Sequence, residues 1–177
     1  MEDGSIFGGG TTTGALYSAQ PSFPDNSCFA ARYRSTSNLQ DTIWTYQDGP
    51  EDGGLELTGG CEAKDGDLIV FGVVDEPWFD EDMSDKETFV IKLNKDTGEL
   101  VEGVQLGPND GFTRSLGFSC NSPDGNLLIA GYTNADWGNK YDDRDDCWIV
   151  KVDTDDLSVI WATQFGKKNS KKKKEIN

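Results

Sequence analysis

A sequence repeat of about 59 residues constrains this chain more than any other feature. Residues 65–74 (DGDLIVFGVV) return 59 positions later as residues 124–133 (DGNLLIAGYT), and residues 3–11 (DGSIFGGGT) form a degenerate third copy. Each copy begins with an Asp-Gly step, which supplies the positive φ that a tight hairpin turn needs. The apolar residues that follow predict a short β-strand after each of the three turns.

A second block follows each copy. Residues 29–33 (FAARY), 89–93 (FVIKL) and 148–152 (WIVKV) are rich in aromatic and β-branched residues, which predicts another strand in each unit. The fourth place of each block is basic. We expect this basic side chain to point away from the buried face, with its stem covering apolar surface.

A third block fixes the register of the repeat. Residues 43–49, 101–107 and 160–166 each carry Gln two places before Gly. An earlier strand is expected at residues 55–63 and 112–120, so that a full unit has four strands. A four-stranded antiparallel sheet that recurs at a fixed period is typical of a β-propeller blade. The alternative, a meandering sandwich, would leave the repeat unexplained.

We therefore predict an all-β fold, a β-propeller segment of about three four-stranded antiparallel blades with the first incomplete. The segment spans residues 1–166, with units at about 3–49, 55–107 and 112–166, and the lysine-rich residues 167–177 form a disordered tail. Since propellers close with four to eight blades, three would leave two apolar faces open. We expect the chain to be a fragment of a longer protein, and assembly of copies to close the ring is the alternative.

The motifs of the last unit also point to a family. Residues 124–133, 146–153 (DCWIVKVD) and 160–166 (IWATQFG) together resemble the SBBP-type β-propeller repeat. The resemblance extends over roughly residues 3–166, and it implies a propeller without implying a reaction.

A weaker similarity involves residues 92–100 (KLNKDTGEL), which resemble the strand-turn-strand element of PQQ-type quinoprotein repeats. That family also implies a propeller, in this case one that encloses a quinone cofactor. Glu102 departs from both patterns, because the other two units carry Trp44 and Trp161 at this place.

Charge limits the partners of the folded part. The net charge is −16, and residues 167–177 hold six lysines and one acid, so the remaining chain has 31 acids against 10 bases, or −21. Such a body would repel phosphate backbones, so we expect no nucleic-acid binding by it. The lysine run itself fits a nuclear-import or anionic-surface patch, or a solubilising end.

The chain is not expected to cross a membrane, because no stretch approaches 18 consecutive apolar residues. Residues 1–5 lack the basic and apolar regions of a secretory signal, although a longer parent protein could be secreted, so the compartment is not fixed.

Two loops rich in acids suggest a calcium site. They connect the Gly-containing strand to the aromatic strand in the second and third units, and clustered carboxylates can supply the six to eight oxygen ligands of calcium. Neither loop has the twelve-residue calcium-loop spacing, so solvated acidic loops are the alternative. The candidate ligands are Asp80, Asp82, Asp85, Asp142, Asp143 and Asp145.

The same two loops carry Trp78, Phe79, Trp137 and Tyr141. Aromatic side chains beside acids can form a platform for a carbohydrate or a contact surface for a protein, which makes these four the candidate partner-binding residues. The alternative is that they fold back and cap the blade.

The four cysteines occupy two repeat positions, Cys61 and Cys120 in the early strands and Cys28 and Cys147 before the aromatic block. Bridging the two classes within one blade would span about 9.6 Å, beyond the reach of a disulfide. We therefore expect free, buried thiols.

The absence of histidine removes Ser-His-Asp and Cys-His catalysis and the usual proton shuttle near neutral pH. We predict a non-catalytic recognition or scaffold module, acting through its acidic, aromatic-bearing loops and without a cofactor. The alternatives are a fragment of a PQQ-like quinoprotein or carboxylate-based enzyme, and a calcium-stabilised adhesive module.

Overall fold

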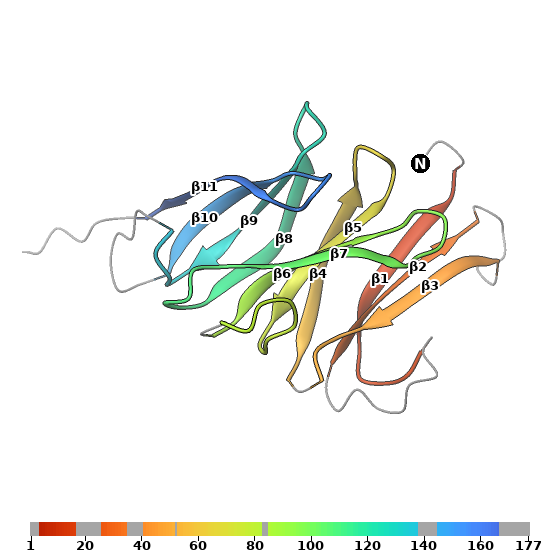
Figure 1. The fold of residues 1–177 in the computed structure, drawn as a ribbon, viewed down its shortest axis with the longest axis horizontal. Helices are drawn as coiled ribbons and strands as arrows, with labels where there is room; N and C mark the ends of the chain where they lie inside the picture. Colours follow the sequence, from red (N-terminus) through yellow and green to blue (C-terminus); the bar gives the residue numbers. More distant parts are fainter. Residues whose placement is uncertain are drawn as a thin grey trace, which may run out of the picture.

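The structure, a computed structural model, consists of three antiparallel sheets arranged side by side (Figure 1). It describes residues 4–16, 26–34, 41–51, 53–82, 85–137 and 145–166. Within these ranges every regular element is a β-strand. The lysine-rich residues 167–177, for which a disordered tail is predicted, lie outside the described residues.

Each sheet corresponds to one sequence unit. The first contains β1 (Ile6–Thr12), β2 (Ser27–Tyr33) and β3 (Thr42–Asp48), in that order. The second contains β4 (Leu55–Glu62), β5 (Leu68–Val74), β6 (Glu87–Leu93) and β7 (Leu100–Leu106). The third contains β8 (Thr113–Asn121), β9 (Leu127–Thr133), β10 (Asp146–Val152) and β11 (Val159–Phe165). We call these sheets the first, second and third blade.

The predicted fold class is confirmed. The chain is a β-propeller segment of two four-stranded blades preceded by a three-stranded one, all meandering and antiparallel. Among the described residues, the first blade has no counterpart of the early strand that begins each of the other two blades. The three-fold recurrence of the Asp-Gly turn is also preserved, because Gly4, Gly66 and Gly125 have φ values of 70°, 87° and 81°.

Two apolar layers hold the blades together, and the second blade contributes to both. Leu68 and Val70 of β5 belong to the layer shared with the first blade, which we call the first interface. Ile69 and Phe71 belong to the layer shared with the third blade, the second interface. Successive residues of a strand point to opposite faces of the sheet, so a strand that is buried on both faces must be apolar without interruption. This explains the unbroken apolar run of β5.

The basic residue in the fourth place of the aromatic strand does not point away from the buried face as predicted. In the second blade this residue, Lys92, is only 3% exposed. Its Nζ donates hydrogen bonds to Asp65 Oδ2 at 2.7 Å, within the blade, and to the carbonyl oxygen of Thr154 at 2.9 Å, in the third blade. The prediction was wrong because it treated the charge as needing water, whereas the neighbouring blade supplies an acceptor.

The same link joins the first two blades. Arg32 occupies the place of Lys92 in the first blade, and its guanidinium donates a hydrogen bond to the carbonyl oxygen of Lys95 in the second. Lys95 and Thr154 lie at equivalent places, 59 residues apart, in the turns that follow β6 and β10. In each of the first two blades, a basic side chain therefore donates to the corresponding turn of the next blade.

The part of the chain that the structure describes contains no helix with the length and hydrophobicity that membrane crossing requires.

Candidate binding cleft at the edge of the first blade

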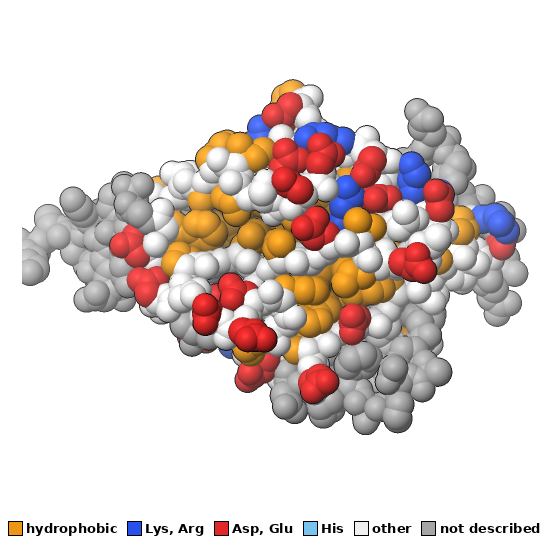
Figure 2. All heavy atoms as spheres, in the orientation of Figure 1, with side chains coloured by type: hydrophobic (Ala, Val, Ile, Leu, Met, Phe, Trp, Pro, Cys, Tyr) orange, Lys and Arg blue, Asp and Glu red, His pale blue; other side chains and the backbone are white. Residues whose placement is uncertain are grey.

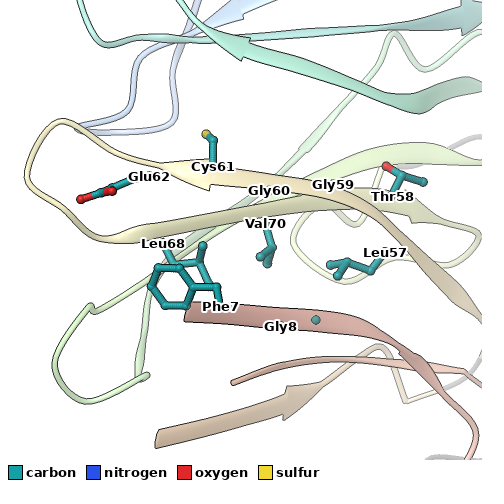
Figure 3. A pocket seen from close by; sticks show the side chains of 11 residues that line it. Phe7, Gly8, Leu57, Thr58, Gly59, Gly60, Cys61, Glu62, Leu68 and Val70 are labelled. Atoms are coloured by element: carbon teal, nitrogen blue, oxygen red, sulfur yellow. The ribbon is translucent and has the colours of Figure 1, made fainter. Parts of the chain in front are cut away.

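A cleft of about 460 Å³ lies between the first and second blades. Its walls are residues 7–9 of β1, residues 57–62 of β4, and Leu68 and Val70 of β5 (Figure 3). Figure 3 shows the side chains of Phe7, Leu68 and Val70 pointing into the space between the two blades. The cleft is lined mainly by apolar side chains and glycine backbone.

The two long walls of the cleft converge at one end. The backbone N–H of Leu57 donates a 2.9 Å hydrogen bond to Thr11 Oγ1, which ties β4 to β1. Near this end the approach is close, since a Cβ on Gly9 would lie 3.0 Å from Leu57 Cδ2. Toward Phe7 and Glu62 the strands separate and the cleft opens.

The cleft runs along an edge of β1 that no described strand pairs with. The other edge of β1 pairs with β2 through a continuous register, from Ile6 opposite Tyr33 to Thr12 opposite Ser27. In the second blade the equivalent strand, β5, is paired on both edges, with β4 and with β6. An unpaired strand edge exposes N–H and C=O groups that can pair with another extended segment.

One thiol lies on the far side of the cleft wall, because Cys61 of β4 points away from the cleft and packs against the second interface (Figure 3). Cys61 of β4 is half-buried and free, and burial, with a smaller contribution from Cys120 nearby, raises its pKa to about 11. The thiol is therefore protonated near neutral pH and a poor nucleophile.

All four cysteines are free, as predicted, but only Cys28 is fully buried; Cys120 and Cys147 are exposed. Both exposed thiols belong to the third blade, whose outer face no described blade covers. The prediction of burial was wrong for these two for that reason.

The recurring Gln holds the acid-rich loops. Gln105 Oε1 accepts hydrogen bonds from the backbone N–H groups of Trp78, Phe79 and Asp80, at 2.6, 2.6 and 3.2 Å. In the third blade Gln164 Oε1 accepts from the N–H of Trp137 at 2.9 Å. The sequence revealed the recurrence of this Gln but no sign of its partners, because they lie 25 or more residues away.

The same role extends to the first blade, where Gln47 Oε1 accepts from the N–H of Leu16 at 2.8 Å and its Nε2 donates to the carbonyl of Gly14. One side chain therefore fixes the start of the corresponding loop in all three blades.

The structure places three of the four candidate partner-binding aromatics against the blades. Trp78 lies 5.4 Å from the ring of Phe89 in an edge-to-face arrangement and 4.4 Å from Phe79. Trp137 stacks on Trp148 at 6.0 Å. All three candidates are half-buried or partly buried and contact the interface layers, which matches the alternative that they cap the blades. Tyr141 lies outside the described residues.

The candidate calcium ligands are dispersed or lie outside the description. Asp80 Oδ1 accepts a hydrogen bond from the N–H of Asp82 at 2.9 Å, and Asp85 Oδ1 accepts from the N–H of Lys86 at 2.8 Å. Asp145 is exposed, and Asp142 and Asp143 are not described. Among the described residues, no group of three His, Cys, Asp or Glu side chains could hold a metal ion. Calcium binding by the loops stays a prediction.

Glu87, which the sequence did not mark as a candidate site residue, lies at the end of one of these loops. Glu87, the first residue of β6, is fully buried, and its Oε1 has no hydrogen-bond partner in the described structure. Burial, with a further contribution from the charge of Asp80, raises the pKa of Glu87 to about 7, although the Gln105 amide at 3.5 Å opposes the shift. The sequence did not distinguish Glu87 from the six other acids of the loop, because composition does not show which side chain is buried.

The surface around these features is acidic. Figure 2 shows acidic side chains spread over one face of the molecule, with basic side chains among them and patches of hydrophobic side chains between.

No protein-family model matches the chain, and a search of curated proteins found no match. The resemblance to the SBBP-type and PQQ-type repeats therefore stays a prediction.

Proposed function

We propose that this chain is a non-catalytic recognition module, part of a larger propeller, which binds an extended polypeptide segment by adding it as a strand along the free edge of β1. The observation that carries this proposal is the cleft beside that edge, where β1 has no described strand on one side and an apolar wall from β4 and β5 on the other. Main-chain pairing would supply affinity and the apolar wall would select side chains.

The segment that fits best has the character of the early strands. In the second blade β4 pairs antiparallel with β5, and in the third β8 pairs antiparallel with β9. The matching segment for β1 would likewise be antiparallel and would carry small residues where the strands approach, as Gly59 and Gly60 do in β4. A Cβ on Gly60 would lie 2.8 Å from the carbonyl oxygen of Ile69, so close pairing at this point favours glycine.

The acid-rich loops are proposed as a second contact surface of the module, for a basic protein partner. Their acids Glu76, Glu81 and Asp82 are exposed, while the aromatic residues beside them pack against the blades. The loops would therefore attract a basic partner by charge and raise its association rate, and they would add little apolar contact area.

The test uses a blocked synthetic peptide with the sequence of residues 55–62 in which Cys is replaced by Ser, added to the full chain. Binding is measured by fluorescence anisotropy of the labelled peptide, and the site is located by amide hydrogen exchange. We expect saturable binding, with slower exchange in residues 6–12 of β1. The exchange of residues 100–106 in β7 serves as an internal reference, because β7 does not line the cleft.

A matched control peptide carries N-methyl groups on alternate backbone amides and keeps every side chain. It cannot complete a main-chain ladder, so its binding should be lost. The variant Leu57→Asp, shown by circular dichroism to keep its strands, should weaken binding of the unmodified peptide because it places a charge in the apolar wall. Equal binding of both peptides, or no protection of β1, contradicts the proposal.

A further inference from the structure

The third blade has an outer face that faces away from the second blade. Antiparallel partners lie on the same face of a sheet, and Lys151 pairs with Trp161 while Ile149 pairs with Thr163. Trp148 and Val150, which alternate with these residues, are buried in the second interface. Lys151, Ile149 and Trp161 therefore belong to the opposite side, where Trp161 is 43% exposed.

Other strands extend this outer face with apolar residues. Leu128 of β9 pairs with Lys151, and Phe118 of β8 pairs with Ala130, which itself pairs with Ile149. Phe118 is 70% exposed. We define the outer face by Phe118, Leu128, Ile149, Lys151 and Trp161.

The first blade presents an equivalent face, and there the second blade covers it. Arg32 pairs with Trp44, at the places of Lys151 and Trp161. Trp44 is only 6% exposed, and its Nε1 donates a 2.8 Å hydrogen bond to the carbonyl oxygen of Lys95, the same oxygen that Arg32 binds. The turn after β6 in the second blade therefore receives both side chains.

The ring of Trp44 lies against a glycine of this turn. Gly98 has φ of 75°, and a Cβ there would lie 2.6 Å from Trp44 Cδ2 and Cε3. The positive φ favours glycine at this position, and the approach of the ring leaves no room for a side chain.

The contact between the second and third blades uses a different pair. Glu102 stands at the place of Trp44, paired with Lys92, and Leu157 stands at the place of Gly98. Leu157 adopts φ of 54°, is 1% exposed and packs in the second interface, whereas Glu102 is exposed, so no ring from the second blade lies against this turn. At the first interface a tryptophan on one blade therefore stands with a glycine in the turn of the next, and at the second interface the equivalent places hold glutamate and leucine.

From this we infer that the outer face of the third blade docks a further blade of the same repeat, whose turn after the aromatic strand carries glycine at the place of Gly98. Trp161 and Lys151 repeat the Trp-and-base pair of the first blade, not the Glu-and-base pair of the second. Lys151 already makes the bond within its own blade that Lys92 makes, since its Nζ lies 2.7 Å from Asp124 Oδ2. In the docked state it would also donate to the turn carbonyl of the further blade.

A second copy of this chain does not supply that turn. The open side of its first blade would have to receive Trp161, and the segment between β2 and β3 there is residues 34–41 (RSTSNLQD). It contains no glycine and has eight residues, against six in the turn from Asn94 to Glu99. The face is therefore matched to a blade of the second unit's kind.

This inference rests on the part of the proposed function that places the chain in a larger propeller, and it is independent of strand binding at β1. The test joins residues 1–166 to an added copy of residues 50–107, which keeps the repeat register because Gly166 occupies the place of Gly49. The exposure of Trp161 is measured by acrylamide quenching, as the difference between each protein and its Trp161→Phe variant. We expect most of the quenching of Trp161 to be lost in the extended chain.

The pairing rule is tested by substitutions in the same extended chain. Gly98→Leu in the added copy alone should restore the quenching of Trp161 and lower the thermal midpoint by on the order of 5 °C. Trp161→Glu combined with that substitution copies the pair of the second interface and should recover the midpoint. Unchanged quenching of Trp161 in the extended chain, or a midpoint indifferent to Gly98→Leu, overturns the inference.

Sedimentation of the unextended chain tests whether a second copy of the chain binds the outer face. We expect a monomer. A dimer that Trp161→Glu dissociates would assign the outer face to a second copy of the chain and overturn the inference, while the peptide test at β1 would be unaffected.

Discussion

Lys92 Nζ lies 2.9 Å from the carbonyl oxygen of Thr154, so that a buried ammonium of the second blade donates a hydrogen bond to a turn of the third. The same Nζ is 2.7 Å from Asp65 Oδ2. Arg32 makes the corresponding bond to Lys95 across the first interface. At each of the two interfaces, a basic side chain of one blade therefore donates a hydrogen bond to a turn of the next blade.

We expect Lys92→Met to destabilise the fold by about 1–3 kcal/mol, because the methionine keeps most of the apolar stem but leaves a buried carbonyl without its donor. The measurement is the free energy of unfolding from urea titration. Lys151→Met is the matched control, since Lys151 occupies the same place with a bond to the exposed Asp124, and its cost should stay within about 1 kcal/mol. Equal costs for the two variants would contradict a role for Lys92 across the interface.

Gln105→Ala should release the loop that begins at Trp78. Three backbone N–H groups lose their common acceptor, so we expect a loss of stability of about 1–3 kcal/mol and faster amide exchange at residues 78–80. Gln47→Ala is the control, because Gln47 Oε1 accepts from the N–H of the exposed Leu16, and its cost should be smaller. If exchange at residues 78–80 is unchanged in Gln105→Ala, the anchoring role of this side chain is wrong.

The blades themselves could be predicted from the sequence because each rests on local signals. The Asp-Gly turns at Gly66 and Gly125 have the positive φ that the pattern required, and the four-strand units follow directly from it. The cleft could not be predicted, since it depends on the approach of Thr11 and Leu57 across two sheets. The burial of Lys92 escaped prediction for a similar reason, because its acceptor belongs to a neighbouring unit 62 residues away.

The raised pKa of Glu87 predicts a stability that falls as pH rises. The folded protein holds this proton up to about pH 7, whereas an unfolded glutamate releases it near its ordinary value of 4.5. The folded state binds more protons between these values, so the free energy of unfolding should decrease from about pH 4.5 to about pH 7 and then level off with respect to this group.

Glu87→Gln removes the titrating group and keeps a side chain of nearly the same size beside Gln105. We expect it to stabilise the protein more near pH 8 than near pH 5, as measured by urea midpoints at the two pH values. Asp82→Asn, a change of an exposed carboxyl in the same loop, should leave the difference between the two midpoints as in the unsubstituted protein. A Glu87→Gln effect that is the same at both pH values would show that Glu87 does not titrate in this range.

The pairing of Trp44 with Gly98 can be exchanged, within the chain as it stands, for the Glu and Leu pair of the second interface. Gly98→Leu alone should be destabilising, because the new side chain meets the ring of Trp44 at 2.6 Å. Trp44→Glu alone should be destabilising as well, because it removes a buried ring and its hydrogen bond to the carbonyl of Lys95. The double variant should cost less than the sum of the two by about 0.5–3 kcal/mol, since the introduced leucine can then occupy the volume that the ring has left.

The three free energies of unfolding, measured by urea titration, give the coupling directly. Gly14→Ala is the control for glycine loss in general, because a Cβ there meets nothing within 4 Å and its cost should be small. Additive costs in the double variant would mean that the ring and the turn glycine do not compete for the same volume. The Trp161 prediction at the outer face would then lose its premise, because it depends on that competition and on no other property of the tryptophan.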